Sequence, residues 1–418
     1  MKEISKHLLH FIKTQFGQKI KSTIKTPIFS KKSQSFLRIL YRHILKASNS
    51  WNKLSHQIQE SPLSTIPIGG EFAKGEAYSY IPNEIKTIIE RSLKYEKTFQ
   101  FKINADTYSV VMVYPVIASN KSINSKTVDR FFENALYKVY LWLWTADRFA
   151  SRDCSSKMNV HLYFTDHLKI LAKTKMEPLD EVHSNTAFTT SCNPTTDIHL
   201  FRSEEWFKVF IHETFHNLGL DFSAMDNMHA NRRILELFPI QKEVRLYETY
   251  CETWAEIIHT LFLAFFTTQT RLVGDWSVIL KKMEGFLHYE MVWSAFQCAK
   301  ILNHYRLSYK QLTDLNCPRA KIARTQYKEN TYVLSYYVIK AILLTQSNEF
   351  IEWVLCHNGP TMNFKKTPEN IMEYCGLVSK IYQNPQWIQY ISIMEEWFNN
   401  NRNTLAIENQ TLRMTLFE

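Results

Sequence analysis

The stretch that decides the fold runs from Trp206 to Phe222 and reads WFKVFIHETFHNLGLDF. Its apolar residues recur at helical spacing, and Gly219 stands where such a helix would end. Ser203 is expected to cap the start of the helix, with two glutamates behind it in the first turn, where negative charge is favourable. The sequence therefore predicts one amphipathic helix from about Ser203 to Leu218.

Two histidines and a glutamate on that helix form a candidate metal site. His212 and His216 are four residues apart, so their side chains project from one face, one turn above the other. Two imidazoles at that separation can hold one zinc ion, and Glu213 lies at the edge of the same face, where a general base is needed. The alternative, that both histidines only line a core, is disfavoured because unpaired imidazoles and carboxylates are costly to bury.

A catalytic zinc ion needs a third protein ligand and leaves its fourth position open. One place for that ligand is a histidine six residues after His216. This position is Phe222, which cannot bind a metal, and Asp221 comes one residue too early. We therefore look for the third ligand on a later helix.

Three glutamates on the next predicted helix, over about 244–266, are candidates for that ligand. Glu248, Glu252 and Glu256 follow one another at four-residue spacing and share one helical face. Stacked like charges are unfavourable unless something positive faces them, and a zinc ion with two histidines would supply it. The alternative is a solvated acidic stripe.

At these residues the chain resembles the zincin metallopeptidases, and within them the glutamate-ligand branch that includes thermolysin and neprilysin. The resemblance implies one zinc ion, peptide hydrolysis with Glu213 as general base, and Glu252 as the third ligand. It also implies that Glu256 supports the first histidine. Shifted by one turn, Glu248 would be the ligand and Glu252 its support. The segment Trp206–Phe222 is also similar to predicted metallopeptidases of large DNA viruses of eukaryotes, which implies a viral protein in the host cytoplasm or the virion.

The surrounding pattern predicts an α+β fold. It is expected to comprise a zincin-like catalytic domain, with a small mixed sheet and the active-site helix, followed by a mainly helical C-terminal region. The expected domains are a basic extension at 1–50, a helical, loop-rich lead-in at 51–96, the catalytic domain at 97–266 and a helical domain at 267–418. The expected elements are a hairpin of Thr98–Ile103 with Tyr108–Val116, a helix over 126–149, strands Asn159–Phe164 and Asp197–Phe201, and helices over 275–307, 330–356 and 366–398.

Asp197–Phe201 is interpreted as an edge strand. An exposed edge can align an extended peptide substrate by strand addition. A peptide or protein substrate is thus the expected main partner.

The positive charge of the chain is concentrated at its start. Eleven lysines and arginines and one acid, Glu3, lie between Met1 and Lys46, so this segment accounts for the whole net charge of +10. It is expected to be a solvated helical or partly disordered arm. The alternatives are a contact with nucleic acid or an anionic membrane through residues 1–46, or a targeting peptide whose apolar stripe is Ile4, Leu8, Phe11 and Ile12.

Cysteine usage and hydropathy favour a cytoplasmic protein. The seven cysteines are scattered, odd in number and without a CxxC pair, so reduced thiols are expected. The start of the chain has no uninterrupted apolar segment of the kind found in secretory signals. The longest apolar stretches, Ile257–Phe266 and Tyr332–Leu344, are too short for a transmembrane helix.

Three other functional classes share features with this sequence. A zinc nucleobase deaminase is excluded because it needs a P-C-x-x-C motif, which the chain lacks. A zincin-fold structural or binding protein, such as a virion component whose basic arm contacts nucleic acid or membrane, is the main rival. Glu213 argues against it, since a purely structural metal site needs no base. The third is a nucleic-acid-binding protein centred on residues 1–46.

Overall fold

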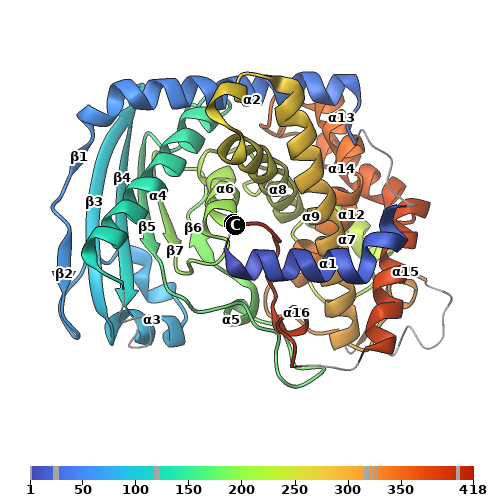
Figure 1. Ribbon diagram of the computed structural model, residues 1–418. Coiled ribbons are helices and arrows are strands. Elements are labelled where there is room, and N and C mark those ends of the chain that lie inside the picture. The colour runs from blue at the N-terminus through green and yellow to red at the C-terminus, as the bar shows by residue number, and fades with distance from the viewer. Residues whose placement is uncertain are drawn as a thin grey trace. The chain divides into compact units, whose positions relative to one another are not determined.

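The computed structural model describes residues 2–21, 28–116, 123–314, 316, 321, 324–325, 327–401 and 405–418 (Figure 1). The fold is α+β, as the sequence predicts, and it divides into two compact units. One, here called the sheet unit, comprises residues 37–168 and 185–224. The other, the helical unit, comprises residues 1–36, 169–184 and 225–418. The four predicted domain ranges stay a prediction.

The sheet unit is built on one mixed sheet. Its described strands are β1 (Gln59–Glu60), β2 (Ser64–Ile66), β3 (Leu93–Ile103), β4 (Asp106–Val116), β5 (Lys157–Tyr163), β6 (Ala187–Thr189) and β7 (Thr195–Leu200). Their order is β1-β3-β4-β5-β7-β6, and β2 also pairs with β3. β5 runs parallel to both β4 and β7, and the remaining pairs are antiparallel. The predicted hairpin and both later strands are confirmed.

The predicted edge strand is wrong in one respect. β7 corresponds to the expected strand, but it lies inside the sheet, between β5 and the short strand β6. β6 pairs antiparallel with β7, with Phe188 opposite His199, and forms the edge among the described strands. A strand of three residues is too short to show an alternating pattern, so the sequence gives no signal for it.

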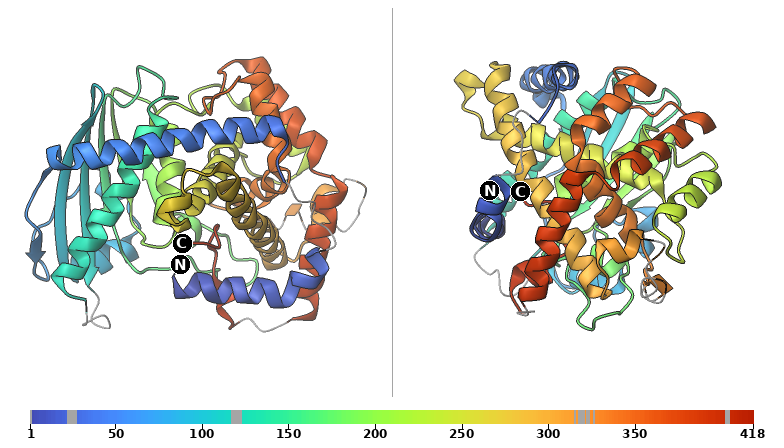
Figure 2. Two further views of the ribbon diagram at one scale, coloured as in Figure 1. Left: turned by 45° about the horizontal axis from the view of Figure 1, so that its top comes forward. Right: turned by 90° about the vertical axis from the view of Figure 1, so that its right-hand side faces the viewer.

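Helices cover one face of this sheet. α4 (Ser125–Ala146) packs on β3 and β4, and α6 (Trp206–Asn217) packs on β6, β7 and α4. α2 (Lys31–Leu54) runs over α4 (Figure 2), with hydrogen bonds of 2.9 Å between Ser48 and Tyr137 and 3.0 Å between Ser50 and Tyr140. The helix predicted over 126–149 is thus confirmed as α4.

A second, smaller core lies on the other face of the sheet. It is formed by α3 (Asn83–Glu90) with the segment before it and by outward residues of the strands. Its buried members are Tyr78, Ile81, Ile85, Ile89, Val111, Val113, Tyr163 and Phe201. Alternation along β5 explains the two layers, since Val160 and Leu162 point to the opposite face from Tyr163.

The helical unit contains most of the remaining elements. They are α1 (Glu3–Lys21), α5 (Glu181–Ser184), α7 (Met228–Leu237), α8 (Leu246–Thr267), α9 (Trp276–His304), α10 (Tyr309–Thr313), a π-helical turn (Leu334–Ile339), α12 (Lys340–Thr345), α13 (Ser347–His357), α14 (Pro368–Ile381), α15 (Pro385–Asn400) and α16 (Ile407–Gln410). α8 packs against α9 and α12. The predicted helix over 330–356 is broken at Gln346 into α12 and α13. No helix in the described ranges is both long and apolar enough to cross a membrane.

The described part of the basic N-terminal segment is not a solvated arm. α1 packs on α9, and its side chains Leu8, Phe11 and Ile12 are buried. The ring of Phe11 lies 5.2 Å from that of Phe296. The stripe that was compatible with a targeting peptide is therefore the face by which α1 joins the core.

The segment after α16 is also buried in the helical unit. Residues 411–417 are all buried, and side chains hold their backbone atoms. Tyr337 donates to the carbonyl of Leu412 at 2.6 Å, and Lys340 donates to that of Met414 at 3.1 Å. The carboxylate of Glu290 accepts from the backbone amides of residues 416 and 417. This segment is thus an integral part of the core.

Candidate metal centre

The helix that carries the two histidines is well defined at both ends. α6 begins at Trp206 after Glu205, whose φ of 59° is left-handed, so Glu205 occupies the N-cap position in place of the predicted Ser203. At the other end, the amide of Gly219 donates to the carbonyl of His216 and that of Leu220 to Phe215. This is the Schellman arrangement, and Gly219 has the positive φ, 60°, that it requires. The predicted end of the helix is confirmed.

The face of α6 away from the histidines anchors the helix to α4. The indole N–H of Trp142 donates to Thr214 Oγ1 at 2.6 Å. The Trp142 ring is also stacked with that of Phe215, with 6.2 Å between the ring centroids. All twelve residues of α6 are buried. A helix fixed in this way holds its side chains in defined positions, which a catalytic site needs.

The two histidine side chains converge. Nε2 of His212 lies 3.4 Å from Nε2 of His216, and both residues are buried. Two nitrogen ligands of a tetrahedral zinc ion, each about 2.0–2.1 Å from the metal, are about 3.3–3.4 Å apart. The separation therefore fits a shared ion. Glu213 lies on the same helix and is 9% exposed.

Asp221 sets the orientation of one of these rings. Its Oδ2 lies 2.6 Å from Nδ1 of His216, and its Oδ1 accepts from Ser223 Oγ at 3.1 Å. Because a carboxylate only accepts, Nδ1 carries the proton and the lone pair of Nε2 is left for a metal. Sequence reasoning tested Asp221 only as a ligand and missed this supporting role. The signal was its place just after the helix-ending glycine.

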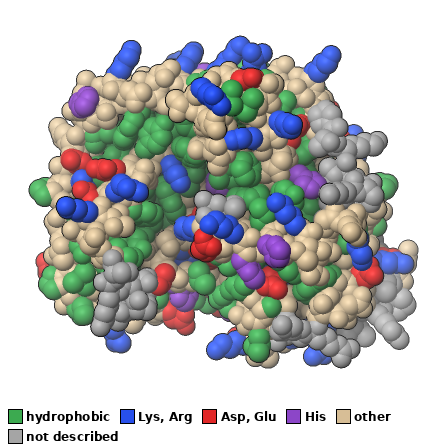
Figure 3. Space-filling view, in the orientation of Figure 1, with side chains coloured by type: hydrophobic (Ala, Val, Ile, Leu, Met, Phe, Trp, Pro, Cys, Tyr) green, Lys and Arg blue, Asp and Glu red, His purple; other side chains and the backbone are tan. Residues whose placement is uncertain are grey.

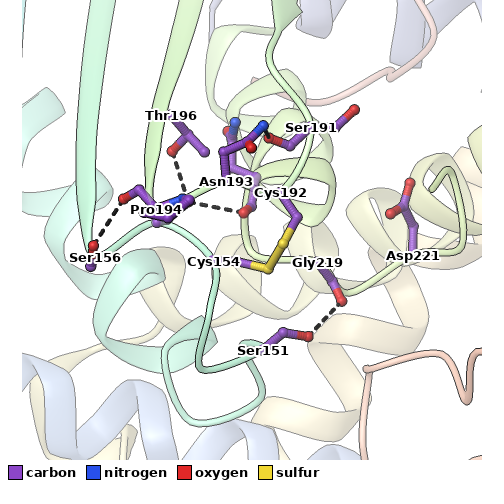
Figure 4. Close-up of a disulfide and its surroundings, with 12 residues drawn as sticks. Ser151, Cys154, Ser156, Ser191, Cys192, Asn193, Pro194, Thr196, Gly219 and Asp221 are labelled. Carbon is purple, nitrogen blue, oxygen red and sulfur yellow. Dashed lines mark hydrogen bonds between the residues drawn. A yellow bond between two sulfur atoms is a disulfide. The ribbon is translucent and has the colours of Figure 1, made fainter.

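A disulfide lies next to the end of α6, contrary to the expectation of reduced thiols. Cys154 and Cys192 are joined across 38 residues, with Cα atoms 4.9 Å apart (Figure 4). A Cβ atom at Gly219 would stand 2.7 Å from Cys154 Sγ, so the sulfur packs against the turn that ends α6. The spacing of the two cysteines follows no short motif, and only the sheet brings the starts of β5 and β7 together. The described free cysteines are Cys251, Cys298, Cys356 and Cys375.

Asn217, the last residue of α6, ties the helix to the edge strand. Its side-chain amide donates to the carbonyl of Thr190 at 2.6 Å, and its Oδ1 accepts from Thr189 Oγ1 at 3.0 Å. Thr189 is the last residue of β6. The histidine-bearing helix and the edge of the sheet are therefore held together within one unit.

The glutamates of α8 are not a solvated stripe. Glu248, Glu252 and Glu256 are 7%, 2% and 0% exposed. The carboxylate of Glu256 lies 3.1 Å from Lys340 Nζ, which also donates to Ser294 Oγ at 3.0 Å. This ion pair occupies the residue that the resemblance assigned to the support of a histidine.

Buried histidine, carboxylate and cysteine side chains in the described part of the chain include groups that can hold a metal ion. Within the sheet unit these side chains are His212, His216 and Asp221, and a hydrogen bond joins Asp221 to His216. The assignment of the third ligand to Glu252 stays a prediction.

Comparison with protein-family models, with curated proteins and with solved structures finds no match to this chain.

Proposed function

We propose that this chain is a zinc-dependent peptidase in which His212 and His216 bind the ion and Glu213 is the general base. The observation that carries the proposal is the convergence of the two Nε2 atoms at 3.4 Å, with Asp221 fixing the tautomer of His216. A metal-binding histidine typically donates its other ring N–H to a carboxylate or carbonyl, and a histidine that only fills a core has no need of this arrangement.

For the third ligand we propose Glu252, and Glu248 is the alternative. Both are buried on α8, and the ion pair of Glu256 with Lys340 argues against the third glutamate of that face. An acidic residue of α8 would complete the two-histidine, one-glutamate set found in catalytic zinc sites with an open fourth position.

The chemistry divides between the ion and the chain. A bound zinc ion would polarise the scissile carbonyl and lower the pKa of a water molecule. Glu213 takes the proton from the water as its oxygen adds to the carbonyl carbon, and it then delivers this proton to the amine nitrogen as the C–N bond breaks. His216 keeps its orientation throughout because Asp221 holds its Nδ1.

For the substrate we propose an extended peptide that pairs with β6. β6 is the edge strand among the described residues, and a free edge offers main-chain hydrogen bonds to any sequence. The hydrogen bonds of Asn217 with Thr189 and Thr190 hold this edge next to the C-terminal end of α6. A protein that holds the peptide backbone there accepts many side chains.

The test is a comparison of the natural chain with Glu213→Gln, using a peptide library read by mass spectrometry and zinc content measured by elemental analysis. The natural chain should hold one zinc ion and cleave peptides. The variant should keep the zinc and lose at least a hundredfold in kcat/KM, since a general base contributes roughly 10²–10⁴-fold. Glu133→Gln, on the exposed side of α4, is the matched control.

Three outcomes would contradict the proposal. Absence of stoichiometric zinc would remove the metal site, and full activity in Glu213→Gln would remove the base. Zinc binding without cleavage of any peptide would favour a zincin-fold structural or binding protein. Zinc content of Glu248→Gln and Glu252→Gln then identifies the third ligand, and a loss only in Glu248→Gln would favour the alternative assignment.

A further inference from the structure

One face of α2 is unusually basic. The helix spans 24 residues without an aspartate or glutamate and carries Lys31, Lys32, Arg38, Arg42, Lys46 and Lys53. All six side chains are exposed. The opposite face is buried, with Phe36, Leu40 and Ile44 each at most 2% exposed. The helix is therefore docked by its apolar side and presents its charged side outward.

Five of these cations form a row. At 100° per residue, Lys31, Arg38, Arg42, Lys46 and Lys53 fall within an arc of about 80°. At 1.5 Å per residue, they extend over about 33 Å. We call these five residues the α2 row. Basic side chains project at the top of Figure 3, where Figure 1 places α2.

The charges of the α2 row are not neutralised within the described part of the chain, where none of the five makes an ion pair. α1 and the residue before it differ, since Lys2 pairs with Glu418, Lys6 with Glu3, and Lys19 with Glu396. Arg148 adds a further positive charge beside the α2 row. Its charge and that of Lys46 both act on His43 of α2, whose pKa is lowered first by burial and then by these two charges. Arg148 is exposed, and its guanidinium carbon lies over the ring of Trp144, 4.6 Å from the ring centroid.

The chemistry of this surface favours a rigid polyanion over a membrane or a single strand. A helix that enters a membrane interface needs a free apolar face, but the apolar face of α2 is used for packing. Ser35 and Asn49 lie between the cations, and among the α2 side chains Ile39 is the exposed large apolar one. No aromatic side chain stands in the row to stack on bases, as single-strand binders require. A duplex instead offers about one phosphate charge per 1.7 Å of axis.

We propose that the α2 row is a binding surface for the phosphate backbone of double-stranded nucleic acid, without sequence preference. Lysine and arginine contacts to phosphates position a duplex and carry no base information. The site is separate from α6, so the inference does not depend on the proposed peptidase activity. The sequence allows a nucleic-acid contact anywhere in residues 1–46, and the proposal places this contact on one face of α2 that extends to Lys53.

The experiment measures binding of the full chain to a fluorescent 30-base-pair DNA duplex over a series of salt concentrations. The triple variant Arg38→Gln, Arg42→Gln, Lys46→Gln keeps helix propensity and removes three charges of the row. The control triple variant Lys6→Gln, Lys13→Gln, Lys19→Gln removes the same net charge from α1. Circular dichroism checks that each variant keeps its helix content.

We expect the natural chain to bind at roughly micromolar to sub-millimolar concentration near physiological salt. The slope of log K against log salt should become shallower by about 2.7 in the α2 variant, about 0.9 for each lost phosphate contact. The α1 variant should keep most of the slope. Equal losses in both variants would show a net-charge effect only and would overturn the proposal. So would tighter binding to phosphatidylserine vesicles or to single-stranded DNA than to the duplex.

Discussion

At the scale of single residues, the role of Asp221 in orienting the ring of His216 can be tested by a single substitution. Without its carboxylate, the ring of His216 loses the partner held at 2.6 Å and with it the preference for a proton on Nδ1. We expect Asp221→Ala to weaken zinc binding by about 10–100-fold, the usual effect of removing such a partner. Competition with a chelator of known affinity measures this. Asp153→Ala, at an exposed position, serves as control, and unchanged zinc affinity in Asp221→Ala would show that the carboxylate does not orient the ring.

The sequence could identify the candidate residues that are recognised by their spacing along a single helix. His212, Glu213 and His216 need only the helical spacing, and Gly219 needs only its place after the last turn. Asp221 reaches His216 because the chain reverses at Gly219, a consequence of backbone geometry that a spacing rule for ligands does not contain. The choice between Glu248 and Glu252 likewise depends on packing.

At the scale of elements, β7 contains a buried histidine whose protonation should destabilise the folded chain. His199 is fully buried, with its ring 4.7 Å from His161 on β5 and 5.0 Å from Phe188 on β6. Burial lowers the pKa of His199 to about 3, and the neighbouring charge of His161 adds to this. Asp197 is the carboxylate that acts on the pair, through His161. Gly75 lies directly against both rings, where a Cβ atom would be 2.1 Å from His199 Cε1.

The consequence for stability follows from proton binding. The unfolded chain binds a proton at His199 near pH 6.5, whereas the folded chain does so only near pH 3. The stability that the neutral ring contributes is therefore complete above pH 6.5, and it is lost by about 1.4 kcal/mol per pH unit as the pH falls towards 3. We expect His199→Phe to make the unfolding free energy less dependent on pH between 7 and 4, measured in urea. His56→Gln, at an exposed histidine, should leave the slope unchanged. The same slope in His199→Phe as in the natural chain would refute the assignment.

Elements with a long periodic pattern could be predicted, and short ones could not. The hairpin of β3 and β4 and the helix α4 form where they were expected, but β3 begins at Leu93, before the expected start at Thr98. β6 has three residues and forms because β7 offers it an edge. The Cys154–Cys192 bond belongs with β6, since the sheet and the end of α6 bring two distant cysteines together.

At the scale of the whole molecule, the helical unit depends on a buried ion pair. Glu256 and Lys340 lie 3.1 Å apart with side chains 0% and 2% exposed, and Lys340 also holds the carbonyl of Met414. Removing one member leaves a buried charge without its partner, which costs about 3–5 kcal/mol. We therefore expect Lys340→Met to lower the melting temperature strongly. The double variant Lys340→Met, Glu256→Gln should recover most of that loss, and an equally low melting temperature in it would show that the pairing of charges is not what matters.

The organisation into two units was beyond the reach of the sequence for a topological reason. The helical unit combines residues from the beginning, middle and end of the chain, and the sheet unit is interrupted by residues 169–184. Composition and turn signals mark boundaries along the sequence, so they favour contiguous domains. The packing of α1 on α9 is likewise a contact between distant segments. The charges of α1 indicate which of its sides faces solvent, but they do not indicate that its other side packs on α9.

The buried segment at residues 411–417 also has a consequence for the order of events during synthesis. At roughly 5–20 residues per second, on the order of 20–80 s separate the appearance of α1 from that of this segment. The sheet unit, whose last residue is 224, is complete long before then. Until residues 411–417 have been made, the side chains of the helical unit that hold this segment lack their partners. A nascent chain stalled before residue 411 should therefore protect the sheet unit from protease while leaving the helical unit open to cleavage and to chaperones.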